Sequence, residues 1–181
     1  MAVSDSEDVQ EYTNRESNID IRLSNKAKAN NMVKLKADGY QISWGYTDAA
    51  KSRVELIKNE EKLTGNDKFL TLKNTVQEAL YRDVYENVDL QYFITPQGVK
   101  ENIILKDKNA RTSFTTQYKA EGLTAVQVDD KTISLQDKDG KTVYTFHAPY
   151  MMDADGNTSD GVTITLKNQK DGKFTVKTNA Q

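Results

Sequence analysis

"VDLQYFITPQGVKENIILK", residues 88–106, alternates apolar and polar residues on both sides of a break at Pro96 and Gly98. Such period-two alternation is typical of a strand with one buried face, and Pro and Gly are typical of turns. An even loop pairs Tyr92 with Ile103, whereas an odd loop sets Gln91 against Ile103 and mixes the two faces. We therefore predict a hairpin whose core face carries Leu90, Tyr92, Ile94, Ile103 and Leu105.

Three other hairpins follow from the same test of register. Two of them are predicted to turn on Asp38-Gly39 and Asp139-Gly140, and the third on the three-residue loop 170–172, with Gly172 at positive φ. Each turn places apolar residues opposite apolar residues, as a sheet with one buried face requires. The predicted pairs are Val33 with Trp44, Leu35 with Ile42, Ile133 with Phe146, Leu135 with Tyr144, and Leu166 with Val176.

The remaining pattern is also of period two, with turn residues at regular intervals. Residues 74–82 fit either a short helix or a strand. About a dozen strands are too many for one open sheet, so we predict an all-β fold, an antiparallel two-layer β-sandwich built from hairpins. Residues 1–17 are expected to be a flexible segment and 18–181 a single domain, with a subdivision near 60–75 left open. Further strands are predicted at 19–23, 53–57, 69–72, 81–85, 112–118 and 125–128.

Composition excludes several classes of function. The net charge is −2, and Lys and Asp/Glu are interspersed without a basic stripe in the sequence, so we expect no nucleic-acid partner. There is no cysteine, which removes thiol chemistry and disulfides. No apolar run approaches the ~20 residues that span a bilayer, so no membrane span is expected. The acidic start "MAVSDSEDVQEY" lacks the apolar core of a signal peptide, and we expect any export signal to lie outside this sequence.

The best metal candidate is the loop "DADGNTSDG", residues 153–161, which holds four oxygen ligands of the kind that Ca²⁺ prefers. Its Gly156 falls at the fourth place rather than the sixth, and no Glu stands twelfth, so the EF-hand pattern is absent. Asp, Asn and Gly are also ordinary turn formers, and a plain turn is favoured over a calcium site. The candidate ligands are Asp153, Asp155, Asn157 and Asp160.

Catalytic residues are hard to find in this sequence. His147, the single histidine, has no nucleophile motif such as G-x-S-x-G to serve, so a structural or surface role is favoured. Carboxylates lie near tyrosines and could line a sugar-binding cleft, but outward charges on strands explain them better. These carboxylates are Asp83, Glu86, Asp89 and Glu101. The aromatic residues that such a cleft would use are Trp44, Tyr81, Tyr85 and Tyr92.

Residues 84–106 resemble a segment that recurs in large secreted bacterial proteins with RHS repeats, of the wall-associated and polymorphic-toxin type. In that segment an aromatic-Asn-Val-Asp-Leu-x-Tyr run is followed by a turn and by Val-Lys-Glu before an aliphatic triplet. Residues 122–166 are similar to its continuation, with Ala148-Pro149 and a Met-x-Asp-Ala-x-Gly turn at 151–156. The signature positions in this chain are Asp89, Tyr92, Gly98, Lys100 and Glu101.

The resemblance implies the N-terminal β module that precedes a DNRLRE-type domain in such proteins, secreted or at the cell surface. It carries over no catalytic residue and no cofactor, so we expect a structural or interaction module rather than an enzyme. The expected partners are the neighbouring domains of the parent protein and the cell envelope. The alternative is a carbohydrate-binding or carbohydrate-active β-sandwich. Trp44 discriminates between them, because the Asp38-Gly39 register points it into the core.

Overall fold

The structure is a computed structural model that describes residues 11–13, 19–28, 30–58, 76–95 and 98–181. These residues form strands and turns and contain no helix, which confirms the predicted all-β fold. Residues 74–75 lie outside the described part, but 76–82 belong to a strand. The predicted strand at 69–72, the open subdivision near 60–75 and most of residues 1–17 also lie outside it.

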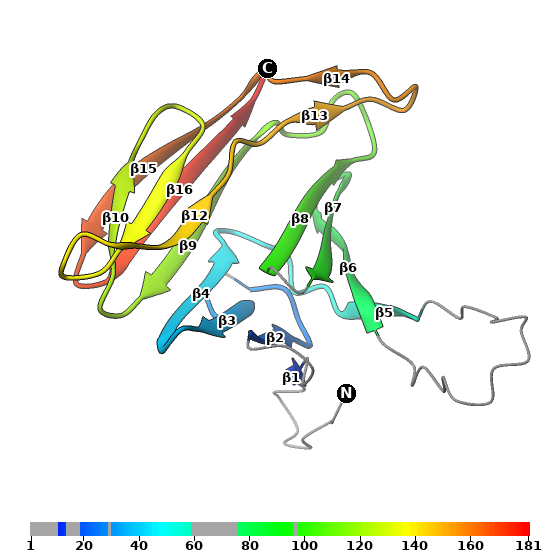
Figure 1. Cartoon of the computed structure of the whole chain (residues 1–181). Coiled ribbons are helices and arrows are strands. Elements are labelled where there is room, and N and C mark those ends of the chain that lie inside the picture. Colours follow the sequence, from blue (N-terminus) through cyan, green and yellow to red (C-terminus); the bar gives the residue numbers. More distant parts are fainter. Residues whose placement is uncertain (1–10, 14–18, 29, 59–75, 96–97) are drawn as a thin grey trace, which may run out of the picture.

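A seven-stranded antiparallel sheet forms one layer of the molecule. The first four strands of the chain lie in sequence order, residues 113–120 follow them, and the C-terminal hairpin completes the sheet (Figure 1). In that order the strands are β1 (Glu11–Thr13), β2 (Asp20–Ser24), β3 (Val33–Ala37), β4 (Tyr40–Tyr46), β9 (Ser113–Ala120), β16 (Lys173–Ala180) and β15 (Val162–Lys170).

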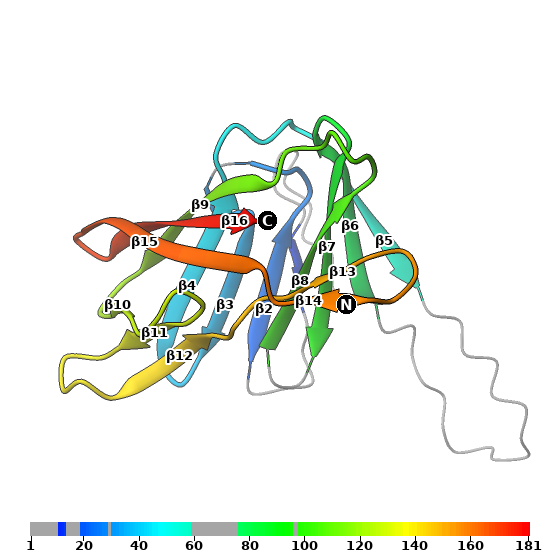
Figure 2. The same ribbon diagram turned by 90° about the horizontal axis from the view of Figure 1, so that it is seen from above.

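Two smaller sheets form the second layer, and a short hairpin completes the described strands. In Figures 1 and 2 the four-stranded sheet lies beside β2, β3 and β4, whereas the three-stranded sheet lies beside β9, β16 and β15. The four-stranded sheet consists of β5 (Val54–Lys58), β6 (Val76–Tyr85), β7 (Val88–Thr95) and β8 (Gly98–Leu105). The others are β10 (Thr124–Gln127), β11 (Ile133–Gln136) and β12 (Thr142–Phe146), then the pair β13 (Met151–Met152) and β14 (Thr158–Ser159).

Aromatic residues join the two layers. On the four-stranded side, the Tyr81 hydroxyl donates a hydrogen bond to the Ser24 carbonyl of β2 at 2.5 Å. On the three-stranded side, the ring of Tyr118 lies 4.9 Å from that of Phe146 and 5.1 Å from that of Phe174. Burying rings of this size removes much apolar area from water, which is the main favourable term in folding. One face of the long sheet therefore packs against both smaller sheets in one core.

The predicted register of the first hairpin is confirmed, with Asp38 and Gly39 both at positive φ, as a two-residue type I′ turn requires. The other two predicted hairpins have the predicted apolar pairs but different turns. Bulges between Leu135 and Gln136 and between residues 167 and 170 shift the register near the turn. The loop at 138–140 is therefore longer than predicted, and the loop at Asp171-Gly172 is shorter.

The hairpin of β7 and β8 keeps the predicted even register but is shifted by two residues. Thr95 pairs with Gly98, so Tyr92 lies opposite Glu101 instead of Ile103. The predicted core face is otherwise correct, except that Leu105 at the strand end is 40% exposed. A shift by two preserves the face of every side chain, because the period of a strand is two. Glu101 shares the face of Ile103 in either register and points inward with the apolar residues, and the shift places it opposite Tyr92.

Candidate functional site

Glu101 is the carboxylate that the hairpin carries into the space between the layers. Its Oε1 accepts a short hydrogen bond from the hydroxyl of Tyr46 on β4. Its other oxygen, Oε2, and the hydroxyl of Tyr92 are both buried, and neither has a hydrogen-bond partner within the described residues. We call Glu101, Tyr46 and Tyr92 the Glu101 cluster. It links β8 of the four-stranded sheet to β4 of the long sheet.

Burial controls the protonation of the Glu101 cluster. It raises the pKa of Glu101, although the hydrogen bond from Tyr46 opposes this shift by stabilising the carboxylate. Burial, with the nearby charge of Glu101, also raises the pKa values of Tyr46 and Tyr92 well above the ordinary range. A low-dielectric environment disfavours charged forms, so burial shifts the equilibrium of each group toward its neutral form. The interpretation of Glu101 as an outward charge was wrong.

The Glu101 cluster is closed off by aromatic rings. Tyr92 is fully buried and Tyr46 is 2% exposed. The Tyr46 ring packs edge-on against Tyr85 and Phe114 at centroid distances of 6.4 Å. A ligand that reacted with Glu101 would have to displace these rings, so the arrangement serves to fix how the two layers pack.

Asp89 belongs to the same hairpin but lies on the opposite face of its sheet. Its Oδ1 accepts hydrogen bonds from the backbone N–H of Asp83 at 2.7 Å and is 2.9 Å from Lys106 Nζ. Arg82 Nη1 lies 3.9 Å from Oδ2. Burial raises the pKa of Asp89, but the Asp83 N–H and Lys106 outweigh it, and the net pKa is lowered. Asp89 is therefore a buried carboxylate that keeps its charge.

The other signature residues do not join either carboxylate. Gly98 has a φ of +147° where β8 begins, a value that favours glycine. Lys100 is exposed opposite Phe93. Tyr92 and Glu101 thus face the core, whereas Asp89 and Lys100 lie on the other face of the sheet. The signature describes one hairpin and forms no single site.

The aromatic residues of the carbohydrate alternative are buried. Trp44 is 9% exposed, Tyr85 is 8% exposed, and Tyr81 is fully buried. The Tyr85 hydroxyl donates to the Thr47 carbonyl at 2.5 Å, and burial raises the pKa of Tyr85 to about 12. No sugar-binding platform can be built from rings in these positions. His147 follows β12 and is exposed.

The candidate calcium loop forms a turn closed by one carboxylate. Asp153 Oδ1 accepts hydrogen bonds from the backbone N–H groups of Asp155 at 3.0 Å and Asn157 at 2.9 Å. Its Oδ2 accepts a hydrogen bond from the side-chain amide of Asn157 at 2.9 Å. Asp160 instead pairs with Lys131 at 2.8 Å. Across the described ranges, no group of three or more His, Cys, Asp or Glu side chains could hold a metal ion. Calcium binding by this loop stays a prediction, and the hydrogen bonds favour the plain turn.

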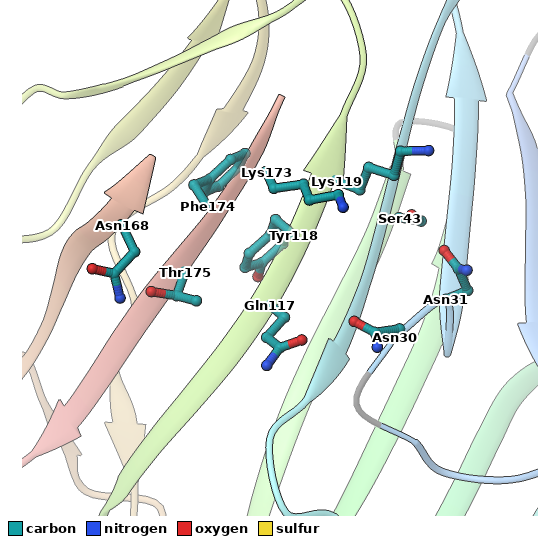
Figure 3. A pocket seen from close by; sticks show the side chains of 10 residues that line it. All are labelled: Asn30, Asn31, Ser43, Gln117, Tyr118, Lys119, Asn168, Lys173, Phe174 and Thr175. Carbon is teal, nitrogen blue, oxygen red and sulfur yellow. The ribbon is translucent and has the colours of Figure 1, made fainter. Parts of the chain in front are cut away.

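A polar groove of about 510 Å³ lies on the outer face of the long sheet. Figure 3 shows Asn30 and Gln117 at one end of it and Lys119 and Lys173 at the other. Sequence patterns did not predict this groove, because its residues come from loops and strands far apart in the chain. Polar residues at alternate positions of β9 and β16 did indicate that one face of these strands is polar. The other lining residues are Asn31, Ser43, Tyr118, Asn168, Phe174 and Thr175.

These features define an all-β protein of two layers, with two buried carboxylates in one hairpin and a polar groove outside. The chain is similar to parts of much longer proteins. It is 31% identical to tRNA nuclease WapA of Bacillus subtilis (strain 168), over 63% of this chain and 5% of that protein. It is 26% identical to tRNA(Glu)-specific nuclease WapA of Bacillus subtilis subsp. natto (strain BEST195), over 93% of this chain and 8% of that protein.

A third relative is a wall-associated protein of Geobacillus stearothermophilus, 24% identical over 72% of this chain and 48% of that protein. The chain therefore spans less than half the length of each of these three relatives. No family model matches the sequence, and no solved structure matches it. The homology to WapA wall-associated proteins supports the coarser part of the predicted resemblance and an association with the cell wall.

The comparisons also correct one prediction. We expected a protein that is not an enzyme, but relatives of this chain are named tRNA nucleases, and this finding overturns that expectation. Within the described residues, no helix is long and apolar enough to cross a membrane.

Proposed function

We propose that this chain is an accessory β module of a large, secreted, wall-associated protein with RHS repeats, placed before its DNRLRE-type domain. The alignment over 93% of this chain with only 8% of a WapA relative carries the proposal. An alignment that nearly fills the shorter chain while covering a small part of the longer one is what a module of a long protein produces. For the longer protein we propose tRNA nuclease activity, as the names of its relatives suggest.

Within that protein, the chain would contribute a rigid body and contact surfaces. A two-layer core joined by buried tyrosines and a hydrogen-bonded carboxylate supports this role, because such packing fixes one arrangement of the layers. Its partners would be the neighbouring domains of the parent protein and the cell envelope. Aromatic carbohydrate binding loses its support, since Trp44 is buried.

The location and size of the natural protein test this proposal. An antibody raised against the folded chain should detect, in the producing cells, a polypeptide far larger than the 20.4 kDa of this chain. The polypeptide should be found in the wall and culture fractions, and an antibody to a cytosolic enzyme should be negative there. A 20 kDa band confined to the cytosol would contradict the proposal.

A further inference from the structure

Four basic side chains form a row across the outer face of the long sheet. Register places Arg22 opposite Lys34, Lys34 opposite Ser43, Ser43 opposite Lys119, and Lys119 opposite Lys173. We call these five residues the basic row. Strands are spaced by about 4.8 Å, so the row extends over about 19 Å. The residues next to the basic row along each strand, such as Trp44 after Ser43, point into the core. Successive residues of a strand point to opposite faces, so the side chains of the basic row point away from the second layer.

Further lysines lie beside the basic row on the outer face of the long sheet. Outward positions of the same sheet add Lys36, Lys167 and Lys177, which follow the alternation of β3, β15 and β16. Among the described residues, carboxylates pair with members of the row: Asp20 lies 3.1 Å from Arg22, and Glu121 lies 2.5 Å from Lys119. The chain has a net charge of −2, so this excess of cations is a local asymmetry. A face of one sign attracts polymers of the opposite sign.

The groove at one end of the basic row adds hydrogen-bonding groups. Carboxamides of Asn30, Asn31, Gln117 and Asn168 line it together with Lys119 and Lys173 (Figure 3). A carboxamide offers donors and an acceptor on one planar group, which suits neighbouring hydroxyls of a sugar or polyol.

The aromatic rings at the groove distinguish this chemistry from that of nucleic-acid binding. Tyr118 and Phe174 stack on each other at 5.1 Å, and Phe174 is only 3% exposed. Both rings belong to the inner face of the sheet, because Tyr118 pairs with Trp44 and with Phe174 and packs on Phe146 of the second layer. Bases of single-stranded nucleic acids bind on exposed aromatic faces, which the outer face does not offer with these two rings. Lysines beside carboxamides and hydroxyls therefore favour a ligand that is both anionic and rich in hydroxyls.

We propose that the basic row and its groove bind an anionic, hydroxyl-rich polymer, either a polyol phosphate or a carboxylated glycan. The sequence shows no basic stripe because these residues lie on five different strands, and only the sheet aligns them. The proposal names a ligand for the envelope contact proposed above and so rests on it. Binding by the purified chain and location in cells are measured separately, so either can fail alone.

Binding of the purified chain to immobilised poly(glycerol phosphate) and polygalacturonate tests the proposal, with dextran as the neutral polymer. Poly(glycerol phosphate), polygalacturonate or both should bind, and the affinity should fall between about 50 and about 200 mM salt because counterions compete. Reversing two charges in Lys119→Glu/Lys173→Glu should weaken binding about tenfold or more. Gln117→Ala keeps the charge and should weaken it about threefold through lost hydrogen bonds.

The matched control is Lys108→Glu/Lys138→Glu, which makes the same change of charge at exposed positions outside the long sheet. It should retain most of the affinity, and thermal melts should show that both double variants are folded. Equal loss in the two double variants would overturn the proposal, because net charge alone would then explain binding. Equal binding to dextran, tighter binding to tRNA than to either polymer, or no binding to either polymer would also overturn it.

Discussion

Asp89 and Glu101 lie in one hairpin, 12 residues apart, and both are removed from water, yet their environments drive their pKa values in opposite directions. Asp89 accepts a backbone N–H and lies 2.9 Å from Lys106 Nζ, which lowers its pKa despite burial. Glu101 accepts a hydrogen bond from Tyr46, which lowers its pKa, but burial outweighs this effect. The net pKa of Glu101 is therefore raised.

The comparison teaches that burial alone does not decide the state of a carboxylate. Transfer from water disfavours the charge in both cases, and the donors around each group decide whether that cost is offset. Asp89 lies on the strand face where Arg82 and Lys106 are available, whereas Glu101 lies on the face that packs against the long sheet. Three substitutions test this contrast, from the largest expected effect to the smallest.

Asp89→Ala should lower the free energy of unfolding by about 2–3 kcal/mol, because it leaves the backbone N–H of Asp83 without its acceptor. Asp83 has a φ of +49°, so this segment has little freedom to find another acceptor. Urea unfolding at pH 7 measures the loss. Because the pKa of Asp89 is lowered on folding, the loss should shrink as the pH falls through that pKa, where the wild type also loses the charge.

Glu86→Ala is the control for Asp89→Ala, since Glu86 is an exposed carboxylate in the turn of the β6–β7 hairpin. It should change stability by less than about 0.5 kcal/mol. A loss for Asp89→Ala no larger than that of the control would mean that the hydrogen bonds of Asp89 contribute nothing to stability.

Tyr46→Phe should cost about 1–2 kcal/mol at pH 7, because it removes the hydroxyl that donates a hydrogen bond to the buried carboxylate oxygen Oε1 of Glu101. Tyr92→Phe is the matched variant from the same cluster. The Tyr92 hydroxyl has no hydrogen-bond partner within the described residues, so its removal should change stability by less than about 0.5 kcal/mol. Equal losses in urea unfolding would show that the two hydroxyls bond Glu101 equally.

Glu101→Gln should change how stability depends on pH more than stability itself. The pKa of Glu101 is raised on folding, so the wild type should lose stability as the pH rises above the unfolded value of about 4.3. The Gln side chain does not ionise, so this loss should be absent. Unfolding free energies of the two proteins should converge near pH 4, and towards pH 8 the variant should gain relative to the wild type. Parallel profiles would contradict the assigned environment of Glu101.

Sequence patterns predicted the pairing of strands better than the turns between them. In the hairpin of β15 and β16, Leu166 faces Val176 as predicted, but a bulge takes up the residues assigned to a longer loop. Burial of one apolar face constrains pairs such as this strongly, whereas a bulge near the turn leaves that face unchanged. The exact loop length was therefore beyond what alternation can determine.

The candidate site was less predictable than the fold. Glu101 was identified as a signature residue, and its alternation with Ile103 already indicates the core face, but its position opposite Tyr92 depends on a shift of two residues that alternation cannot detect. The basic row was missed, because its members are distant in sequence. Arg22 and Lys173 fall into one row only because five strands pair in register. The direction of the Trp44 side chain was predicted correctly, since it follows from a two-residue turn.

The sequence by itself determined the all-β class, the hairpins and the apolar face of each strand, because these depend on local alternation and turn residues. Only the tertiary structure decided which strands meet as neighbours across the long sheet and which groups surround each buried carboxylate. Those outcomes depend on the order of strands and on contacts between residues far apart in the chain. For that reason the charge of Asp89, the pKa of Glu101 and the basic row could be assigned only after the layers were assembled.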